Sequence, residues 1–237
     1  MDYGTLYLIP CPISDETAPW DVLPAANRDV MNSLDYFIVE NTRSARRFLS
    51  KAGVERPIGE LEFRELNVHT AAGREGEELV KPLLGGRSAG VISEAGVPGV
   101  ADPGALVVEA CHRRGIRVVP LVGPSSIILA VMASGLNGQS FAFNGYLPVK
   151  PPERAKAIRF FERRALTEGQ SQLFIEAPYR NGKLMEQLVQ TLGAETRLTV
   201  AVELTAPGGR IETRTAGEWR RRPLPELNKR PAIFIIG

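Results

Sequence analysis

Short apolar runs alternate with helical patterns through the first half of the chain. Four runs, each mostly β-branched or aliphatic and closed by a proline, a glycine or a polar residue, have the character of buried strands. They cover residues 6–10, 36–40, 89–93 and 117–122. The helical patterns between them cover residues 20–34, 44–52, 74–84 and 105–114. Because strands that alternate with helices form right-handed crossovers, this half predicts a mainly parallel sheet.

The order of predicted elements changes after Gly123, where strand patterns follow one another with less helix between them. The strand candidates are residues 139–148, 172–177, 197–204, 209–217 and 231–237. The helical patterns are residues 125–134, 153–166 and 182–192. Successive strands of this kind are typical of a mixed or antiparallel sheet. We therefore expect an α/β protein with a first domain over residues 1–123 and a second over residues 124–237.

Composition narrows the possible chemistry. The 237 residues are 43% hydrophobic and 24% charged, an ordinary globular balance. No apolar run is long enough to span a membrane and no basic region precedes the first run, so we expect a cytoplasmic protein without membrane association. The only cysteines and histidines, Cys11, Cys111, His69 and His112, have no metal-ligand spacing, so we expect no metal. With a net charge of +2, any polyanion must bind at a local patch.

Chemistry-bearing residues gather after the predicted strands, where open α/β sheets bind ligands. The segment SEAGVPGVADPG, residues 93–104, has glycines that allow a ligand close to the backbone and prolines that restrict the loop. Two interpretations fit this segment. It is a ligand-binding loop, or it is a long turn in which Asp102 caps the next helix and a proline begins it.

Other strand ends also allow two interpretations. Glu40 ends a strand, and Arg43 with two further arginines follows on the first helical turns. This arrangement fits an anion site built from arginine and a helix N-terminus, or a capped helix with solvated arginines. Ser125 and Ser126 follow a Gly-Pro pair at the start of a helical pattern. They are ligand donors or helix caps.

In the second half, Glu176 ends a strand and Tyr179 and Arg180 follow it. These two side chains are suited to stack on or clamp an aromatic or nucleotide substrate, or to pack structurally. The densest basic run, WRRRP at residues 219–223, is an RNA contact or a solvated face. The chain has no GxGxxG, GxxxxGK[ST] or GxSxG motif, which argues against dinucleotide, P-loop and serine-nucleophile chemistry.

Taken in order, seven segments resemble the tetrapyrrole methylase superfamily of S-adenosylmethionine-dependent methyltransferases. They are LYLIPCPISD, ENTRSARRFL, ISEAGVPGVADPG, GIRVVPLVGPSS, FNGYLP, LFIEAPYR and VELT. The similarity is greatest to the branch that methylates ribose 2′-hydroxyls of small-subunit ribosomal RNA, called ribosomal RNA small subunit methyltransferase I. The resemblance implies two α/β domains with S-adenosyl-L-methionine in the cleft between them. It also implies a homodimer, and ribosomal RNA or the small ribosomal subunit as a partner.

The resemblance further implies a set of cofactor-binding residues, many of them acting through the backbone. They are Pro12, Ser93, Glu94, Ala95, Gly96, Val97, Ser125, Ser126, Glu176, Thr205 and Pro231. A ribose hydroxyl is a poor nucleophile, so a base or a nearby cation should help to remove its proton. Our candidate catalytic carboxylates are Glu40 and Asp102, and Arg43 and Arg180 are our candidates for binding a substrate phosphate.

The chain departs from the family pattern at several positions. In the first loop, Cys11, Ser14 and Asp15 stand where Thr, Gly and Asn are common. Glu94 stands where Asp is usual, and Val97 stands where Thr is usual. Two alternatives therefore stay open. One is a relative that methylates a tetrapyrrole or another small acceptor, and the other is a non-catalytic cofactor- or RNA-binding relative.

A polar stretch typical of the ribosomal branch aligns only with a short segment of this chain. Asn67, His69 and Thr70 are the residues that match it. This stretch bears on the acceptor rather than on the fold.

Overall fold

The structure, a computed structural model, describes residues 2–66 and 74–237. The chain forms two compact units, Met1–Ser125 and Ser126–Gly237. The boundary between these units lies two residues beyond the one proposed from the sequence. Each unit contains one five-stranded sheet with helices packed against it.

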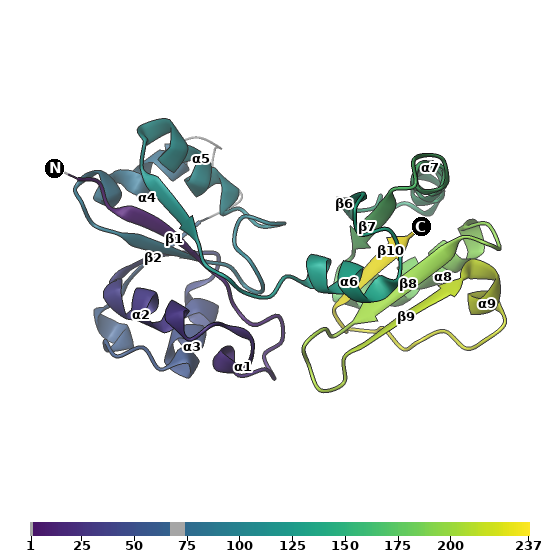
Figure 1. The fold of residues 1–237 in the computed structure, drawn as a ribbon, viewed down its shortest axis with the longest axis horizontal. Helices are drawn as coiled ribbons and strands as arrows, with labels where there is room; N and C mark the ends of the chain where they lie inside the picture. Colours follow the sequence, from purple (N-terminus) through teal and green to yellow (C-terminus); the bar gives the residue numbers. More distant parts are fainter. Residues whose placement is uncertain (1, 67–73) are drawn as a thin grey trace. The chain divides into compact units, whose positions relative to one another are not determined.

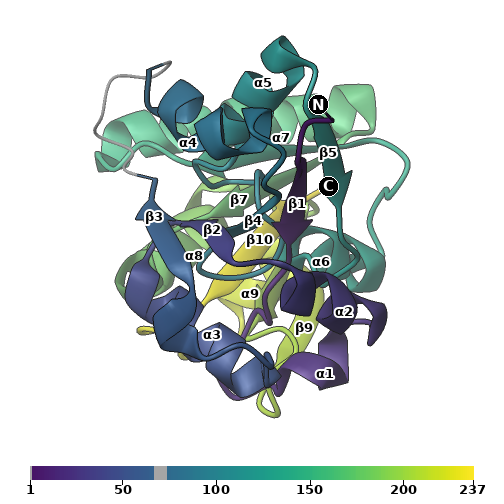
Figure 2. The ribbon, with the colours of Figure 1, turned by 90° about the vertical axis from the view of Figure 1, so that its left-hand side faces the viewer.

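The first unit has a sheet in the order β3-β2-β4-β1-β5, and all of its pairings are parallel (Figure 2). Its strands are β1 (Thr5–Ile9), β2 (Tyr36–Val39), β3 (Glu62–Glu65), β4 (Ala89–Ile92) and β5 (Arg117–Pro120). Its helices are α1 (Pro19–Val22), α2 (Ala26–Ser33), α3 (Thr42–Ala52), α4 (Arg74–Leu84) and α5 (Ala105–Arg114), with the 3₁₀ turn η1 (Ile58–Glu60). The prediction of a parallel sheet is confirmed.

Both faces of the first sheet are buried, which explains why its central strands β1, β2 and β4 carry no charged residue. Leu6 and Val91 pack on the face covered by α4 and α5. Ile9 and Phe37 pack on the opposite face. Helices α1, α2 and α3 cover that face (Figure 1). All four of these side chains are at most 3% exposed, so the sheet forms the centre of a three-layer unit.

Two features of the first unit correct the sequence prediction. Residues 20–34 form two helices instead of one, because Pro24 has no amide hydrogen to continue the first helix. The indole of Trp20 nevertheless fixes α1 by donating to the Ala52 carbonyl at 3.0 Å. The edge strand β3 was missed, since its sequence EFRE is charged and half-exposed and lacks an apolar run.

The second unit has a mixed sheet in the order β6-β7-β10-β8-β9, in which only β6 and β7 pair in parallel. Its strands are β6 (Phe141–Tyr146), β7 (Ser171–Ile175), β8 (Arg197–Val202), β9 (Arg210–Thr215) and β10 (Ala232–Ile236). Its helices are α6 (Ser126–Ser134), α7 (Pro151–Glu168), α8 (Asn181–Thr191) and α9 (Ala216–Arg220), with the 3₁₀ turn η2 (Pro178–Arg180). The prediction of a mixed second sheet is confirmed.

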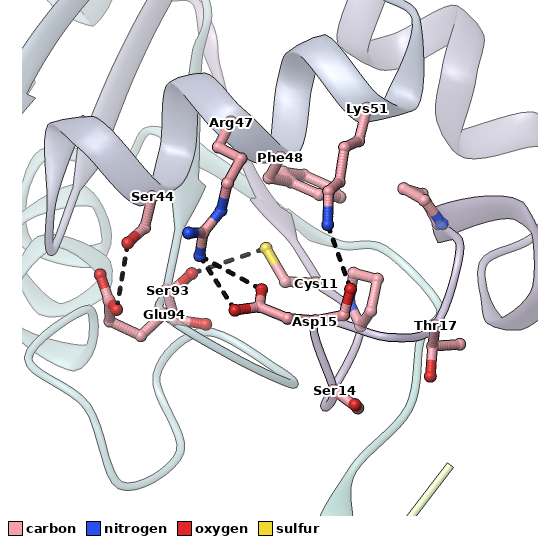
Figure 3. A pocket seen from close by; sticks show the side chains of 12 residues that line it. Cys11, Ser14, Asp15, Thr17, Ser44, Arg47, Phe48, Lys51, Ser93 and Glu94 are labelled. Atoms are coloured by element: carbon pink, nitrogen blue, oxygen red, sulfur yellow. Dashed lines mark hydrogen bonds and ion pairs between the residues drawn. The ribbon is translucent and has the colours of Figure 1, made fainter. Parts of the chain in front are cut away.

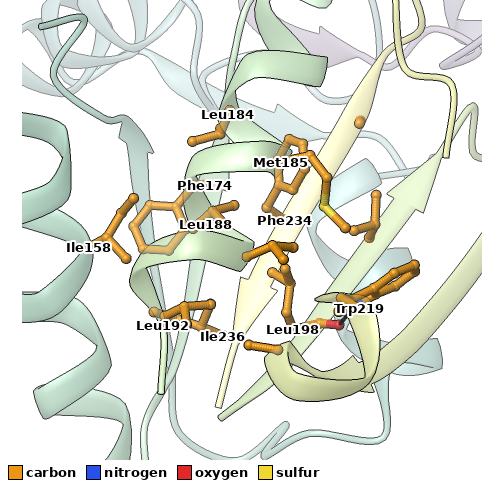
Figure 4. Packing of buried hydrophobic residues seen from close by; sticks show 14 of the residues in the cluster. Ile158, Phe174, Leu184, Met185, Leu188, Leu192, Leu198, Trp219, Phe234 and Ile236 are labelled. Atoms are coloured by element: carbon orange, nitrogen blue, oxygen red, sulfur yellow. Dashed lines mark hydrogen bonds between the residues drawn. The ribbon is translucent and has the colours of Figure 1, made fainter. Parts of the chain in front are cut away.

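The main core of the second unit lies between its sheet and the helices α7, α8 and α9 (Figure 4). Phe174, Leu188 and Phe234 are fully buried there, and the indole of Trp219 donates to the Leu198 carbonyl at 3.0 Å. Helix α6 covers the other face of the sheet. Each layer therefore has its own apolar contact with the sheet.

The packing of the core predicts that two phenylalanines of the second unit contribute very differently to the free energy of unfolding. Phe174→Ala removes a fully buried ring and should lower the free energy of unfolding by about 3–5 kcal/mol. Phe160→Ala removes a ring that is 52% exposed, so its cost should not exceed about 1 kcal/mol. Urea unfolding followed by Trp219 fluorescence in a Trp20→Phe background measures both. Equal losses for the two variants would contradict this account of the core.

Candidate functional site

The loops that follow the parallel strands of the first unit meet at one edge of the sheet, as predicted. Parallel pairing places the carboxyl ends of β1, β2 and β4 side by side. The amide of Cys11, after β1, donates to the Gly96 carbonyl at 2.8 Å. The amide of Glu94, after β4, donates to Glu40 Oε2, after β2, at 3.3 Å. Hydrogen bonds thus connect three of the predicted ligand-binding segments.

A single carboxylate organises the glycine-rich loop of residues 93–104. Asp102 Oδ1 accepts hydrogen bonds from the amides of Gly99 and Gly104, both at 2.7 Å. The N-cap of helix α5 is Gly104 and not Asp102, so Asp102 holds the turn that leads into the helix through the Gly104 amide. Gly96 and Gly99 have φ values of 70° and 83°, which glycine adopts without strain. The loop is therefore fixed by Asp102 and by backbone conformation.

The two candidate catalytic carboxylates come together in the structure. Glu40 and Asp102 border one cavity of about 10 Å³, with Ser93 and the apolar ends of β2 and β4. The space admits about one water molecule at most. Asp102 Oδ2 is buried, and no residue within the described ranges donates a hydrogen bond to it. The Ser93 hydroxyl borders the same cavity and donates to the Ala95 carbonyl at 3.3 Å.

Both carboxyl groups hold a proton more tightly than an isolated carboxyl does. Burial raises the pKa of Asp102, although the amides of Gly99 and Gly104 oppose that rise. Burial also raises the pKa of Glu40, against the Glu94 amide, and the negative charges of Asp102 and Glu94 raise it further. Glu40 is exposed as a whole residue, but its carboxyl borders the cavity and is partly withdrawn from water. Such a pair can store and transfer a proton.

The backbone amides at the N-terminus of α3 already have side-chain hydrogen-bond acceptors. Asn41 Oδ1 accepts from the amides of Arg43 and Ser44, at 2.9 and 3.1 Å. Glu65 Oε1 accepts from the Thr42 amide at 2.9 Å. The prediction of an anion site formed by these helix amides is therefore wrong. The exposed Arg43 remains a candidate through its guanidinium alone.

The first loop packs against α3 around a second cavity, of about 40 Å³ (Figure 3). Arg47 Nη2 lies 3.2 Å from Asp15 Oδ2, and Lys51 Nζ donates to the Asp15 carbonyl at 3.1 Å. Across the cavity, the Ser44 hydroxyl donates to Glu94 Oε2 at 3.2 Å. These contacts tie the loop to the helix.

Three of the candidate cofactor-binding residues, Pro12, Ser93 and Glu94, line this second cavity. Burial raises the pKa of the Cys11 thiol well above its usual range, and that thiol donates to the Ser93 carbonyl at 3.5 Å. Cys11 is consequently a packing residue and not a thiolate nucleophile.

The other residues of this region that the resemblance implies as cofactor-binding lie on the loops or at the unit boundary. Ala95 is exposed and Val97 is half-buried on the glycine-rich loop. A Cβ on Gly96 would lie 3.5 Å from the Pro124 carbonyl, so the segment after β5 approaches the same loop. Ser125 is the last residue of the first unit, and Ser126 begins α6.

In the second unit, Glu176, Thr205 and Pro231 lie at one edge of the mixed sheet. Strands β7 and β8 end at this edge and the antiparallel strand β10 begins there. The Glu203 amide donates to the Pro231 carbonyl at 2.9 Å. Thr205 has a φ of 69°, in the left-handed region.

Glu176 and Arg180, predicted separately as a cofactor residue and a substrate residue, form an ion pair. The Glu176 side chain is 1% exposed, and its Oε1 accepts from Arg180 Nε at 2.9 Å and from Arg180 Nη2 at 2.6 Å. Arg154 Nη1 lies 3.9 Å from Glu176 Oε2. The remaining guanidinium nitrogen of Arg180, Nη1, donates to the Tyr179 hydroxyl at 3.0 Å.

Sequence reasoning missed Arg154, which reaches Glu176 from α7. A signal was present, because Arg154 shares the helical spacing of the buried Ile158 and Ala165. An arginine on an apolar helix face indicates a buried acidic partner. The sequence identifies Asp15 only as a departure from the family pattern. Its pairing with Arg47 has no local sequence signal, because 32 residues separate the two.

Some predictions concern absences or undescribed residues. Asn67, His69 and Thr70 lie outside the described residues. Within the described ranges, no three His, Cys, Asp or Glu side chains are grouped so as to hold a metal ion. No helix in the part of the chain that the structure describes has the length and apolar character to cross a membrane.

Comparison with known proteins identifies the family. The family model of Tetrapyrrole (Corrin/Porphyrin) Methylases matches residues 6–219. Ribosomal RNA small subunit methyltransferase I of Xylella fastidiosa (strain Temecula1) is 31% identical over 233 residues, which are 98% of this chain and 80% of that protein. The enzyme of the same name from Vibrio cholerae is 34% identical over 200 residues, 84% of this chain and 65% of that protein.

Among solved structures, the crystal structure of the methyltransferase CobJ superposes with a TM-score of 0.64 and 16% identity. The match covers 100% of this chain and 94% of that one, and at this identity it shows the fold alone. The sequence matches, however, cover most of the chain at about a third identity. The chain therefore belongs to the tetrapyrrole methylase family of S-adenosylmethionine-dependent methyltransferases.

Proposed function

We propose that this protein transfers a methyl group from S-adenosylmethionine to a ribose 2′-hydroxyl of small-subunit ribosomal RNA. The acceptor is supported by the name of the relatives, ribosomal RNA small subunit methyltransferase I. The observation that carries the chemistry is the pairing of Glu40 and Asp102 around one cavity at the strand-end edge of the first sheet.

The residues at this edge fit a cationic methyl donor. Asp102 Oδ2 is a buried acceptor to which no described residue donates, and Glu94 adds an exposed carboxylate on the same loop. Negative groups of this kind complement a sulfonium. Bound S-adenosylmethionine supplies an electrophilic methyl group on that sulfonium.

The protein's own residues then have two tasks. The glycine-rich loop positions its carbonyl and amide groups, because Asp102 and the backbone conformation fix it before any ligand binds. Glu40 Oε2 is held by the Glu94 amide, and Oε1 is the oxygen that accepts the hydroxyl proton. Arg43, exposed two residues beyond the Asn41 cap, contacts a phosphate of the substrate.

The first experiment is a calorimetric titration of the purified protein with S-adenosylmethionine, followed by tritium transfer to undermodified small ribosomal subunits. Binding with transfer to a ribose supports the proposal. Binding without transfer refutes the acceptor and keeps the family chemistry. Absence of binding would show that the loop of residues 93–104 does not hold the donor.

Glu40→Gln tests the proposed base. The variant should bind the donor normally but lose most of its turnover, because general-base catalysis contributes about 10²–10⁴-fold. The wild-type rate should rise with pH through the raised pKa of Glu40, and this rise should be absent from the variant. Normal turnover in Glu40→Gln would remove the assigned role.

Glu40 should also leave a signature in stability. The folded protein holds the Glu40 proton more tightly than the unfolded chain does. The stabilisation from this group is therefore complete below the unfolded-state pKa and is lost as the pH rises through the folded-state pKa. Chemical denaturation at a series of pH values should show wild type losing stability relative to Glu40→Gln as the pH increases.

Asp102→Ala and Asp102→Asn separate the loop-fixing role of Asp102 from its charge. Alanine leaves two amides without their acceptor, at a cost of about 1–3 kcal/mol for an unsatisfied group, so donor affinity should fall roughly 5- to 150-fold. Asparagine keeps an oxygen for the Gly99 and Gly104 amides, so its affinity should stay closer to wild type. Equal losses in calorimetry would mean that the charge, and not the loop, determines donor affinity.

We also propose that the protein acts as a cytoplasmic homodimer, as its family resemblance implies. Ile128 and Met132, one turn apart on α6, are 46% and 73% exposed, and such apolar side chains are suited to an interface. Sedimentation equilibrium should give the mass of a dimer for wild type and a lower mass for Met132→Glu. A monomeric wild type would refute the homodimer.

A further inference from the structure

A groove on the second unit remains unused by the proposed chemistry. It lies between the end of β6 and helix α7 and has a volume of about 550 Å³. Its apolar lining includes Tyr146 and Leu147 from the β6 end and Ala157, Phe160 and Phe161 from α7. All of these residues belong to one compact unit.

Two aromatic rings are presented to solvent along this groove. Tyr146 is 64% exposed and Phe160 is 52% exposed. The Phe160 ring makes an edge contact with Phe161, with centroids 5.2 Å apart, and Phe161 makes another with the buried Phe174 at 5.1 Å. Phe160 is thus supported by the core, so little freedom is lost when a planar group stacks on it.

Cations line the same helix. Lys156, Arg159 and Arg163 are exposed on α7, and none of them forms an ion pair within the described residues. Residues 150–168 contain six Lys or Arg and three Glu, a net charge of +3 against +2 for the whole chain.

The glutamates of α7 do not neutralise these three side chains. Glu153 lies 3.6 Å from Lys150, and Glu168 lies 3.0 Å from Arg164. Glu162 accepts from the Gly193 amide and the Thr196 hydroxyl, both at 2.6 Å. The three cations are therefore available to a polyanion.

The groove also begins at the edge where the candidate residues of the second unit lie. Tyr146 pairs with Ile175 in the parallel β6–β7 ladder, and Glu176 is the next residue after Ile175. A chain of nucleotides bound at Tyr146 is consequently continuous with the strand-end edge that carries Glu176 and Arg180.

We propose that this groove binds unpaired nucleotides of the RNA substrate, with bases stacked on Tyr146 and Phe160 and phosphates paired with Lys156 and Arg163. The inference rests on the proposed function, since it assigns a second contact for the same RNA. Exposed aromatics with interspersed cations are how proteins hold single-stranded RNA. A protein partner is disfavoured by the unneutralised cations, which an apolar interface would have to desolvate.

The test measures binding of a fluorescently labelled single-stranded RNA oligonucleotide and a duplex of the same length by anisotropy. Phe160→Ala should weaken single-strand binding roughly 5- to 150-fold, the loss expected for one base stack. Duplex binding should change much less, because paired bases cannot stack on a side chain. The double variant Lys156→Gln/Arg163→Gln should reduce the slope of log K against log salt by about 1.4, or about 0.7 per phosphate contact.

Matched variants control for charge and for helix stability. Arg28→Gln/Arg117→Gln removes two exposed arginines of the first unit and should leave the salt slope unchanged. Leu166→Ala removes a side chain on α7 that is 63% exposed and lies outside the groove, and it should leave RNA affinity unchanged. Urea unfolding verifies that each variant is folded.

Two outcomes overturn the inference. Wild-type RNA affinity and salt slope in both groove variants would exclude the groove as an RNA contact. An altered sedimentation mass with unchanged RNA affinity would identify the groove as an interface between copies of this chain. Failure of the proposed function is separate, because it appears as wild-type protein that binds the donor without transferring methyl groups to ribosomal RNA.

Discussion

Parallel pairing of β1, β2 and β4 decides where polar groups of the first unit must find partners. Three strand ends meet at one edge, and their loops carry amides and carbonyls that the sheet no longer satisfies. A buried amide without an acceptor costs about 1–3 kcal/mol, so these loops are constrained to bond to each other. The contacts of Cys11 with Gly96, and of Glu94 with Glu40, meet this constraint. The Asp102 carboxylate completes it by satisfying two amides through one oxygen, which leaves its second oxygen at the cavity.

At its strand ends, the second unit has to accommodate a buried charge. Glu176 is nearly inaccessible to water, so its carboxylate requires cationic partners. Arg180 supplies two hydrogen bonds and Arg154 a longer-range contact. Removing one partner of such a buried pair typically costs about 3–5 kcal/mol, because the other charge is left uncompensated. Arg180 and the adjoining Tyr179 are therefore held in place at this edge before any ligand arrives.

Local patterns in the sequence were sufficient for most of the fold. The central strands of the first sheet were predictable because burial on both faces makes them apolar throughout. Strand β3 was not predictable by this route, since it lies at a sheet edge and is charged. The Asn144-Gly145 pair, a frequent hairpin signal, instead lies within β6 at an irregularity of the ladder, with Gly145 at a φ of 64°. Tertiary pairing overrides the turn preference there.

The candidate site was predictable to a lesser degree. Motifs placed Glu40 and Asp102 after neighbouring strands, and parallel pairing brought them to one cavity. The partners of Glu176 were not predictable, because whether a strand-end carboxylate is paired depends on a helix 22 residues earlier in the chain, where Arg154 lies. The family resemblance predicts which positions belong to the site. The ion-pair and hydrogen-bond partners of each side chain depend on tertiary packing.

Burial of the two carboxyls is consistent with the difficulty of the reaction. A hydroxyl releases its proton reluctantly, and a carboxylate with an ordinary pKa is a weak base toward it. Partial burial and the neighbouring charges of Asp102 and Glu94 raise the pKa of Glu40, so in the proposed reaction its carboxylate is a stronger base than an ordinary one. Glu40 is exposed as a residue while its carboxyl lies at the cavity, so its pKa is raised without the whole side chain being enclosed. Asp102 thus fixes the loop through the Gly99 and Gly104 amides, and its charge also contributes to the raised pKa of Glu40. In the proposed reaction, donor binding and proton transfer therefore depend on the same carboxylate.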